Sequence, residues 1–285
     1  MEISPLSYSW YEPLQQLANY LDFSITHAIH IQYDNDYVFH NHLPQSRLIF
    51  VESVQGADGG CIEILSGSEG TKSLPIHPKT LFFFPPNLDL VFNYRAGLSC
   101  IGIHFNLSLV PGIDIFETQQ IPYVIPFADA KTLKRLHTAI WNKNNLQDLL
   151  WAKSALLDIS TRFIENNNVE RHLSAMRFAQ KYAAIIQHID SNLRIDTDLE
   201  PIAKQSNLTY DSLQRNFRKD IGITLHAWLA RRISREAARA LAETDEPLKG
   251  IATRLGFSSA AYFHRFIKKH LQTSPSEYRS LHQQK

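Results

Sequence analysis

The sequence predicts a two-domain α+β protein, with an N-terminal antiparallel β-barrel, linker helices and an all-α C-terminal domain. Its 285 residues exceed the roughly 100–200 residues of a usual domain. Short β segments fill the first part of the chain, whereas a helical period dominates from about residue 175 onward. We therefore predict a barrel over residues 1–125, a helical linker or dimerisation region over 126–175, and a helical domain over 176–285.

The N-terminal region contains short β segments with no helical period between them. They are Ser24–Ile31, Arg47–Val51, Gly60–Leu65, Thr80–Phe84 and Cys100–Phe105, and Gly, Pro and Asn residues separate them. Strands at this spacing favour an antiparallel sandwich or barrel over an alternating βαβ fold. We predict a small barrel.

An apolar stripe follows Pro126 and predicts one long helix. Its members recur in steps of three and four over about two heptads: Leu149, Ala152, Leu156, Ile159 and Phe163. Two interpretations remain open, because the stripe could pack on its own barrel or form the seam of a homodimer. The asparagines at 166–168 mark the predicted linker to the C-terminal domain.

Charge is distributed unevenly along the chain. Residues 1–180 carry 12 Lys and Arg against 17 Asp and Glu, a net charge of −5, whereas residues 181–285 carry 17 against 11, a net charge of +6. A basic C-terminal part suggests a polyanionic partner. No window approaches the roughly 18 consecutive apolar residues of a membrane span, and residues 1–5 lack the start of a signal peptide. We expect a cytoplasmic protein without membrane contact.

The C-terminal domain contains an internal repeat. Leu199–Ala203 matches Leu248–Ala252, and beyond the following turn Leu213 aligns with Phe263. Each copy has the pattern of a helix-turn-helix unit: a short helix containing a small residue, a tight turn, a hydroxyl N-cap and a second helix. The predicted N-caps are Thr209 and Ser258.

The second helix of each unit has one apolar and one polar face. Leu213, Phe217 and Ile221 share one face of the first, and Phe263, Phe266 and Ile267 share one face of the second. The opposite faces carry Asp211, Arg215 and Arg218 in the first, and Ala261, Arg265 and Lys268 in the second. One basic amphipathic helix alone would suggest a solvated surface. Duplication favours two major-groove helices, because Arg can bind guanine and small apolar groups can contact a thymine methyl.

An apolar stripe between the two units predicts a connecting helix from Leu225 to Glu243. Its members are Leu225, Trp228, Leu229, Ile233, Ala237, Ala240 and Leu241. Nineteen residues span roughly 28 Å, close to the roughly 34 Å between successive major-groove faces of DNA. One chain could thus place two helices in adjacent grooves.

Specific residues of the second unit resemble the C-terminal signature of AraC/XylS-type transcription regulators. They are the run Gly256–Phe266, Lys268, Lys269 and the run Ser274–Arg279. The resemblance implies double-stranded operator DNA and RNA polymerase as partners, with a homodimer expected. The predicted DNA-contacting residues are Tyr210, Asp211, Gln214, Arg215 and Arg218 in the first unit, and Ser259, Ala260, Ala261, His264, Arg265 and Lys268 in the second.

The chain departs from the family pattern at two packing positions. Gln272 stands where the second unit usually has glycine, and Ile267 replaces a usual phenylalanine. Neither departure removes a DNA-contact residue. The small Ala260 and Ala261 suggest that the second unit contacts fewer base edges directly.

The N-terminal domain is similar to the cupin-type sensor domain of sugar-responsive members of this family. The resemblance implies a sugar or related metabolite as effector, and the candidate ligand-binding residues are His40, His42, Arg47, Phe92, Tyr94 and His104. A metal-binding cupin pairs an HxH motif with a nearby Glu and a later His. Here no Glu follows at that spacing, and Leu90 stands near the position of the later His. We predict no metal and no cofactor.

These observations predict a ligand-responsive, sequence-specific transcription regulator that is not an enzyme. One alternative is a cupin enzyme fused to a DNA-targeting domain, which would require a metal or an acid–base constellation. Another is a ligand-independent DNA-binding protein whose barrel serves only in dimerisation.

Overall fold

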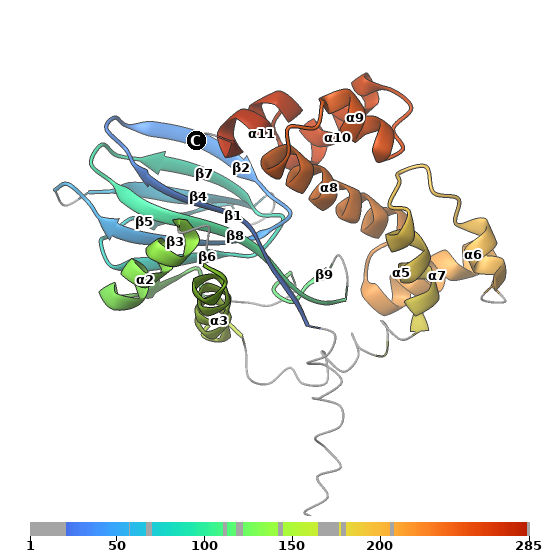
Figure 1. Cartoon of the computed structure of the whole chain (residues 1–285), viewed down its shortest axis with the longest axis horizontal. Coiled ribbons are helices and arrows are strands. Elements are labelled where there is room, and N and C mark those ends of the chain that lie inside the picture. Colours follow the sequence, from blue (N-terminus) through green and yellow to red (C-terminus); the bar gives the residue numbers. More distant parts are fainter. Residues whose placement is uncertain are drawn as a thin grey trace, which may run out of the picture.

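A computed structural model describes residues 21–56, 58–66, 70–110, 113–117, 122–141, 145–164, 177, 181–205 and 208–283. Within these ranges an antiparallel β domain carries two helices on one side and meets a helical C-terminal domain at one end (Figure 1). The predicted fold class is confirmed. The boundary predicted at residue 175 and the asparagines at 166–168 lie outside the described residues, and the three predicted segments stay predictions.

Two antiparallel sheets form the N-terminal domain. The first has the order β1 (Asp22–Gln32), β8 (Ser99–Val110), β3 (Ser46–Ser53), β6 (Thr80–Phe84) and β10 (Val124–Pro126), with β9 (Ile113–Asp114) paired to β8. The second has the order β2 (Tyr37–His42), β7 (Asp89–Tyr94), β4 (Gly60–Ser66) and β5 (Gly70–Pro75). Each β segment expected from the sequence lies in one of these strands.

The described strands of the two sheets do not close into the barrel that we predicted. No ladder among them joins an edge of the first sheet to an edge of the second. Alternating polarity specifies one buried face for each strand, and a packed sandwich satisfies that requirement as well as a barrel does. The sequence pattern therefore supports both, and the structure is a sandwich.

The first sheet is buried on both faces. Phe82 and Phe84 point into the core between the sheets, whereas Phe83 belongs to a second core beneath the helices, and all three are fully buried. A strand covered on both faces needs a continuous apolar run rather than an alternating one. This explains the sequence of β6.

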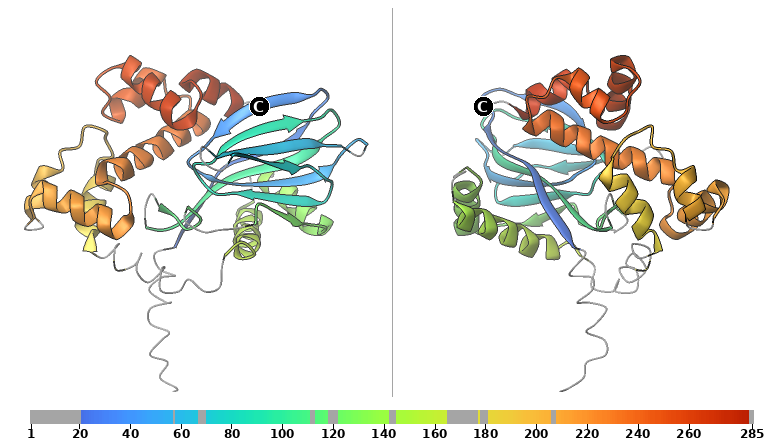
Figure 2. Two further views of the ribbon diagram at one scale, coloured as in Figure 1. Left: turned by 180° about the vertical axis from the view of Figure 1, so that it is seen from behind. Right: turned by 45° about the vertical axis from the view of Figure 1, so that its right-hand side comes forward.

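Two helices cover the outer face of the first sheet. They are α2 (Ala130–Trp141) and α3 (Leu146–Thr161), and they lie on the side of the β domain away from the C-terminal helices (Figures 1 and 2). Ala152, Leu156 and Ile159 of the predicted stripe are buried in the core beneath them, and the ring of Phe163 stacks on Phe83 with centroids 4.6 Å apart. Most of the stripe thus packs on its own β domain. Leu149, however, remains 48% exposed.

The C-terminal domain is helical over its described residues. Its helices are α5 (Ala183–Ser191), α6 (Glu200–Gln205), α7 (Tyr210–Ile221), α8 (Leu225–Glu243), α9 (Leu248–Arg254), α10 (Ala260–Leu271) and α11 (Pro275–His282). The connecting helix α8 has the bounds that the sequence predicted, and every member of its apolar stripe is buried. A single core therefore runs along α8 and joins both helix-turn-helix units.

Two local details of the repeat differ between its copies. The Thr209 hydroxyl caps α7 as predicted, but Ser259 rather than Ser258 caps α10, by accepting from the Tyr262 N–H at 3.1 Å. Both second helices end in a left-handed residue: Gly222 has a φ of 86° and Gln272 a φ of 56°. A residue with a Cβ in this conformation costs roughly 1 kcal/mol relative to glycine, so the family's usual glycine would suit position 272 better.

Candidate DNA-binding surface

The first helix-turn-helix unit buries one face of α7 against α5, α6 and α8. Leu213 and Phe217 are fully buried, and the Phe217 ring contacts Trp228 of α8 with centroids 5.8 Å apart. The outward face follows from this packing. Asp211, Arg215 and Arg218 are exposed, as the helical period predicted.

Two predicted contact residues of α7 are engaged within the protein. The Gln214 side chain donates to the Tyr210 hydroxyl at 2.7 Å, and its Oε1 accepts from the Leu225 N–H at 3.3 Å. The Tyr210 hydroxyl also makes a close hydrogen bond with Nε2 of His226. Together these contacts fix α7 against the first turn of α8, so Gln214 would have to exchange partners to bind a base.

The second unit packs around an aromatic cluster. The Phe257 ring lies about 5.1 Å from those of Phe263 and Phe266, and the turn that carries it passes through Gly256 in a left-handed conformation. A Cβ at Gly256 would lie 2.3 Å from Oδ1 of Asp196, so only glycine fits this turn. The cluster sets the inward face of α10.

The outward face of α10 carries all six predicted contacts of the second unit. They are Ser259, Ala260, Ala261, His264, Arg265 and Lys268, and each is exposed. Ser259 also caps the helix, so its side chain already has a backbone partner. Small side chains at the first turn leave room for the close approach of a duplex, whereas His264, Arg265 and Lys268 supply donors one turn further on.

The cations on these two faces differ in their pairing from most of the other arginines of the C-terminal domain. Six arginines form salt bridges with carboxylates: Arg194, Arg231, Arg232, Arg235, Arg239 and Arg254. Arg215, Arg218, Arg265 and Lys268 form none with any described residue. Arg215 has a single neutral contact, to the Ser212 hydroxyl at 3.2 Å. Unpaired cations on two exposed helical faces are what binding to phosphates and base edges requires.

Comparison with known proteins agrees with this arrangement. A family model described as a helix-turn-helix domain matches residues 202–280. The chain is 39% identical over 90 residues to the probable transcription factor PqrA of Proteus vulgaris, covering 32% of this chain and 70% of that protein. It is 32% identical over 101 residues to the multiple antibiotic resistance protein MarA of Escherichia coli K12, covering 35% of this chain and 80% of MarA.

The chain belongs to the AraC/XylS family of transcription regulators. Its C-terminal domain is therefore a DNA-binding domain of that family. Over 94% of its length the chain also shares its fold with ToxT from Vibrio cholerae O395, at a TM-score of 0.55 and 11% sequence identity, and the match covers 100% of that chain. The N-terminal β domain followed by paired helix-turn-helix units is thus an architecture already seen in a solved structure.

The six predicted ligand-binding residues lie in different parts of the β domain. Phe92 and Tyr94 are buried in the core between the sheets. His42 and His40 lie at the end of β2, where Nδ1 of His42 is 2.6 Å and Nε2 of His40 is 3.8 Å from Oδ1 of Asp89. The other two, Arg47 and His104, are cross-strand partners on β3 and β8.

Arg47 is a structural residue in this arrangement. It is 1% exposed, and it donates to Oδ1 of Asn41 at 2.6 Å and to the carbonyl oxygens of Pro85 and Leu88 at 3.3 Å each. Burial lowers the pKa of its guanidinium to about 9. Its hydrogen bonds tie β3 to β2 and to the turn before β7. We predicted that Arg47 contacts a ligand, whereas most of its N–H groups already donate hydrogen bonds within the protein.

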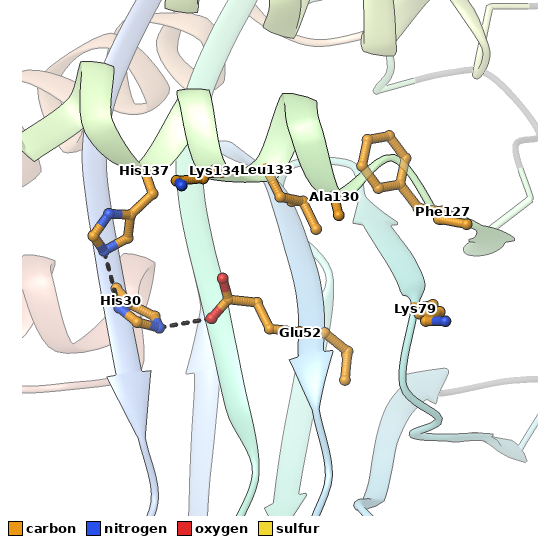
Figure 3. Close-up of a pocket in the computed structure, with 10 residues that line it drawn as sticks. His30, Glu52, Lys79, Phe127, Ala130, Leu133, Lys134 and His137 are labelled. Atoms are coloured by element: carbon orange, nitrogen blue, oxygen red, sulfur yellow. Dashed lines mark hydrogen bonds and ion pairs between the residues drawn. The ribbon is translucent and has the colours of Figure 1, made fainter.

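A cavity of about 410 Å³ lies elsewhere, between the outer face of the first sheet and α2 (Figure 3). It is lined by His30, Val51, Glu52, Lys79, Phe127, Ala128, Ala130, Leu133, Lys134 and His137. None of these residues was predicted from the sequence, because the position of α2 over β1 and β3 is a tertiary arrangement. Among the described residues no group of three or more His, Cys, Asp or Glu could hold a metal ion.

The β domain contacts the DNA-binding domain through α8. The Glu117 carboxylate, 8% exposed, accepts from Arg235 at 3.1 Å and makes a close ion pair with Arg231. Arg235 also donates to the Pro44 carbonyl at 3.0 Å, and Leu43 is buried in the core of the C-terminal domain. The helix that spaces the two DNA-binding units is therefore held directly by the N-terminal domain. Among the described helices, none is long and apolar enough to cross a membrane.

Proposed function

We propose that α7 and α10 insert into successive major grooves of a specific DNA site. The observation that carries this proposal is the pairing contrast: among the described residues the exposed arginines on both second helices lack carboxylate partners, whereas six other arginines of the domain have one. The length of α8 supports the spacing, since its 19 residues span roughly 28 Å. Arg215 and Arg265 are the base-edge candidates of the two units.

Arg215 and Arg218 are predicted to play different roles on DNA. Arg215→Ala should weaken binding to the preferred site by roughly 1–3 kcal/mol and relax the preference at one base pair, because a base-edge contact is lost. Arg218→Ala should weaken binding to all sequences alike, because a phosphate contact carries no sequence information. Fluorescence anisotropy on the selected site and on scrambled DNA, over a range of salt concentrations, measures both. Equal losses on the two DNAs for both variants would contradict the assignment.

We propose further that the N-terminal domain makes DNA binding responsive to a small molecule and that the protein has no catalytic role. The contacts of Glu117 and Pro44 with α8 support this. A conformational change that a ligand causes in the β domain would pass through these contacts to the helix between the two units. A ligand acts only if it binds one arrangement of the domains more tightly than another. An unsaturated fatty acid occupies one ToxT structure of the same fold, so the fold alone gives no preference for a sugar.

We also propose a homodimer, formed through the exposed apolar beginning of α3. Leu146 is 70% exposed, Leu150 59% and Leu149 48%, and Trp141 at the end of α2 is 38% exposed. Clustered apolar exposure of this kind is typical of an interaction site. Sedimentation velocity should show a dimer for the wild type and a monomer for Leu150→Lys. A wild-type monomer at all concentrations would contradict this part of the proposal.

A further inference from the structure

The cavity beneath α2 combines apolar walls with a small set of polar groups. Phe127 is buried and Leu133 is half-buried, and they supply the apolar surface (Figure 3). A volume of about 410 Å³ lies within the range of small-molecule sites. It is separate from the exposed faces of α7 and α10 and from the six residues predicted as ligand contacts.

A chain of hydrogen bonds runs along one side of the cavity. Nε2 of His137 lies 3.2 Å from Nδ1 of His30, and Nε2 of His30 lies 2.7 Å from Oε2 of Glu52. The Ser99 hydroxyl donates to the same Oε2 at 2.9 Å. The other carboxylate oxygen, Oε1, has no hydrogen-bond partner among the described residues, and Figure 3 shows it directed toward α2. The cavity thus offers one fixed acceptor.

Two lysines give the cavity an excess of positive charge. Lys79 comes from the turn before β6 and Lys134 from α2, and neither forms a salt bridge with a described residue. Glu52 is the one carboxylate among the lining residues. With both histidines neutral, the lining carries a formal charge of +1. A ligand of charge −1 would balance it.

The turn that carries Lys79 is held on both sides. The Lys79 N–H donates to the Val51 carbonyl at 3.0 Å, and the Lys79 carbonyl accepts from the Phe127 N–H at 2.8 Å. Its φ of 60° is left-handed, a conformation that a lysine adopts at a cost. The backbone therefore fixes the position of Lys79 at the edge of the cavity, where its side chain is exposed.

We infer that this cavity binds a hydroxycarboxylate monoanion, which is the effector class for the ligand response proposed above. Lys134 binds the carboxylate, Glu52 accepts a hydrogen bond from the hydroxyl, and Phe127 and Leu133 cover the apolar body. A neutral sugar would leave both lysines without a counter-charge. An amino acid zwitterion would leave the charge of +1 unbalanced.

Matched probes test each part of this recognition on the full chain. Mandelate carries a carboxylate, a hydroxyl and an apolar ring, phenylacetate lacks the hydroxyl, and 1-phenyl-1,2-ethanediol lacks the carboxylate. Gluconate and glucose form a second pair for a polyol body. Isothermal titration calorimetry should give the lowest Kd for the hydroxy acid of a set, on the order of 10-fold below that of each partner. Partners that bind as tightly as the hydroxy acids, or hydroxy acids that do not bind, would overturn the inference.

Two lysines on α2 provide a matched pair of variants. Lys134→Gln removes a cation from the cavity, whereas Lys131→Gln removes an exposed cation from the same helix outside the lining residues. The first should raise the Kd for the hydroxy acid on the order of 10-fold and reduce its salt dependence, and the second less than 2-fold. Equal effects of the two substitutions would show that the cavity is not the site.

DNA binding without ligand separates this inference from the proposed function. Wild type and Lys134→Gln should bind the selected DNA equally, because α2, which carries Lys134, lies away from α7 and α10 (Figure 1). If the wild type shows no sequence-specific DNA binding, the proposed function is wrong, whatever the cavity binds. Intact DNA binding without binding of any hydroxycarboxylate would defeat only the inference about the cavity.

Discussion

Trp228→Ala is expected to lower the free energy of unfolding of the C-terminal domain by about 3–5 kcal/mol and to abolish binding by both helix-turn-helix units. Trp228 is fully buried in the first turn of α8, where its indole contacts the Phe217 ring of the first unit and lies under the Arg232 guanidinium. The same core continues along α8 to the second unit. Removing the indole leaves a cavity beside the first unit, in the core that α8 shares with the second unit.

Thermal unfolding and DNA binding measure the two parts of this prediction. Val38→Ala is the control, because Val38 is 64% exposed on β2 and should cost less than about 1 kcal/mol. A Trp228→Ala variant with the wild-type melting temperature would contradict the assignment of α8 as the shared core.

Glu117→Gln is expected to lower the stability of the full chain by about 2–4 kcal/mol. The substitution keeps the shape of the side chain but leaves Arg231 and Arg235, 29% and 11% exposed, without their shared carboxylate. Breaking an ion pair that is largely buried costs more than the pair contributes, because the remaining charge stays desolvated. The nearby Asp114 does not take the place of Glu117, because its two carboxylate oxygens already accept hydrogen bonds from the Leu107 and Phe116 N–H groups.

Differential scanning calorimetry provides the measurement, and Glu243→Gln provides the control. Glu243 also pairs with an arginine of α8, at 3.3 Å from Arg239, but both side chains are at least 40% exposed. Such a pair contributes about 0.5 kcal/mol or less. Equal small losses for both variants would show that the contact between the domains does not stabilise the chain.

Periodicity predicted the C-terminal domain closely. The spacing of Trp228, Ile233 and Leu241 gave both ends of α8, since a long helix buried on one face leaves a regular stripe. The repeat placed both second helices and their outward faces. The N-cap of α10 was one residue off because Ser258 and Ser259 are adjacent hydroxyls, and the backbone conformation decides which of them caps the helix.

The N-terminal domain was predicted less completely. Apolar runs such as Thr80–Phe84 gave the central strands, but the polar edge strands β2 and β5 carry weak signals. The cavity proposed as the ligand site was not predicted, for another reason. His30, Glu52 and His137 meet only after α2 packs on β1 and β3, and no local spacing encodes that contact. The predicted contacts Phe92 and Tyr94 fulfil the ordinary role of aromatic residues in a core.

Selection of binding sites from random duplex DNA, followed by footprinting, tests most directly the claim that one chain places α7 and α10 in two successive major grooves. The account predicts two preferred sequence blocks on the same face of the duplex, about 10 base pairs apart. Arg215→Ala should relax one block and leave the other unchanged. A single block, or selection of no sequence at all, would contradict the claim.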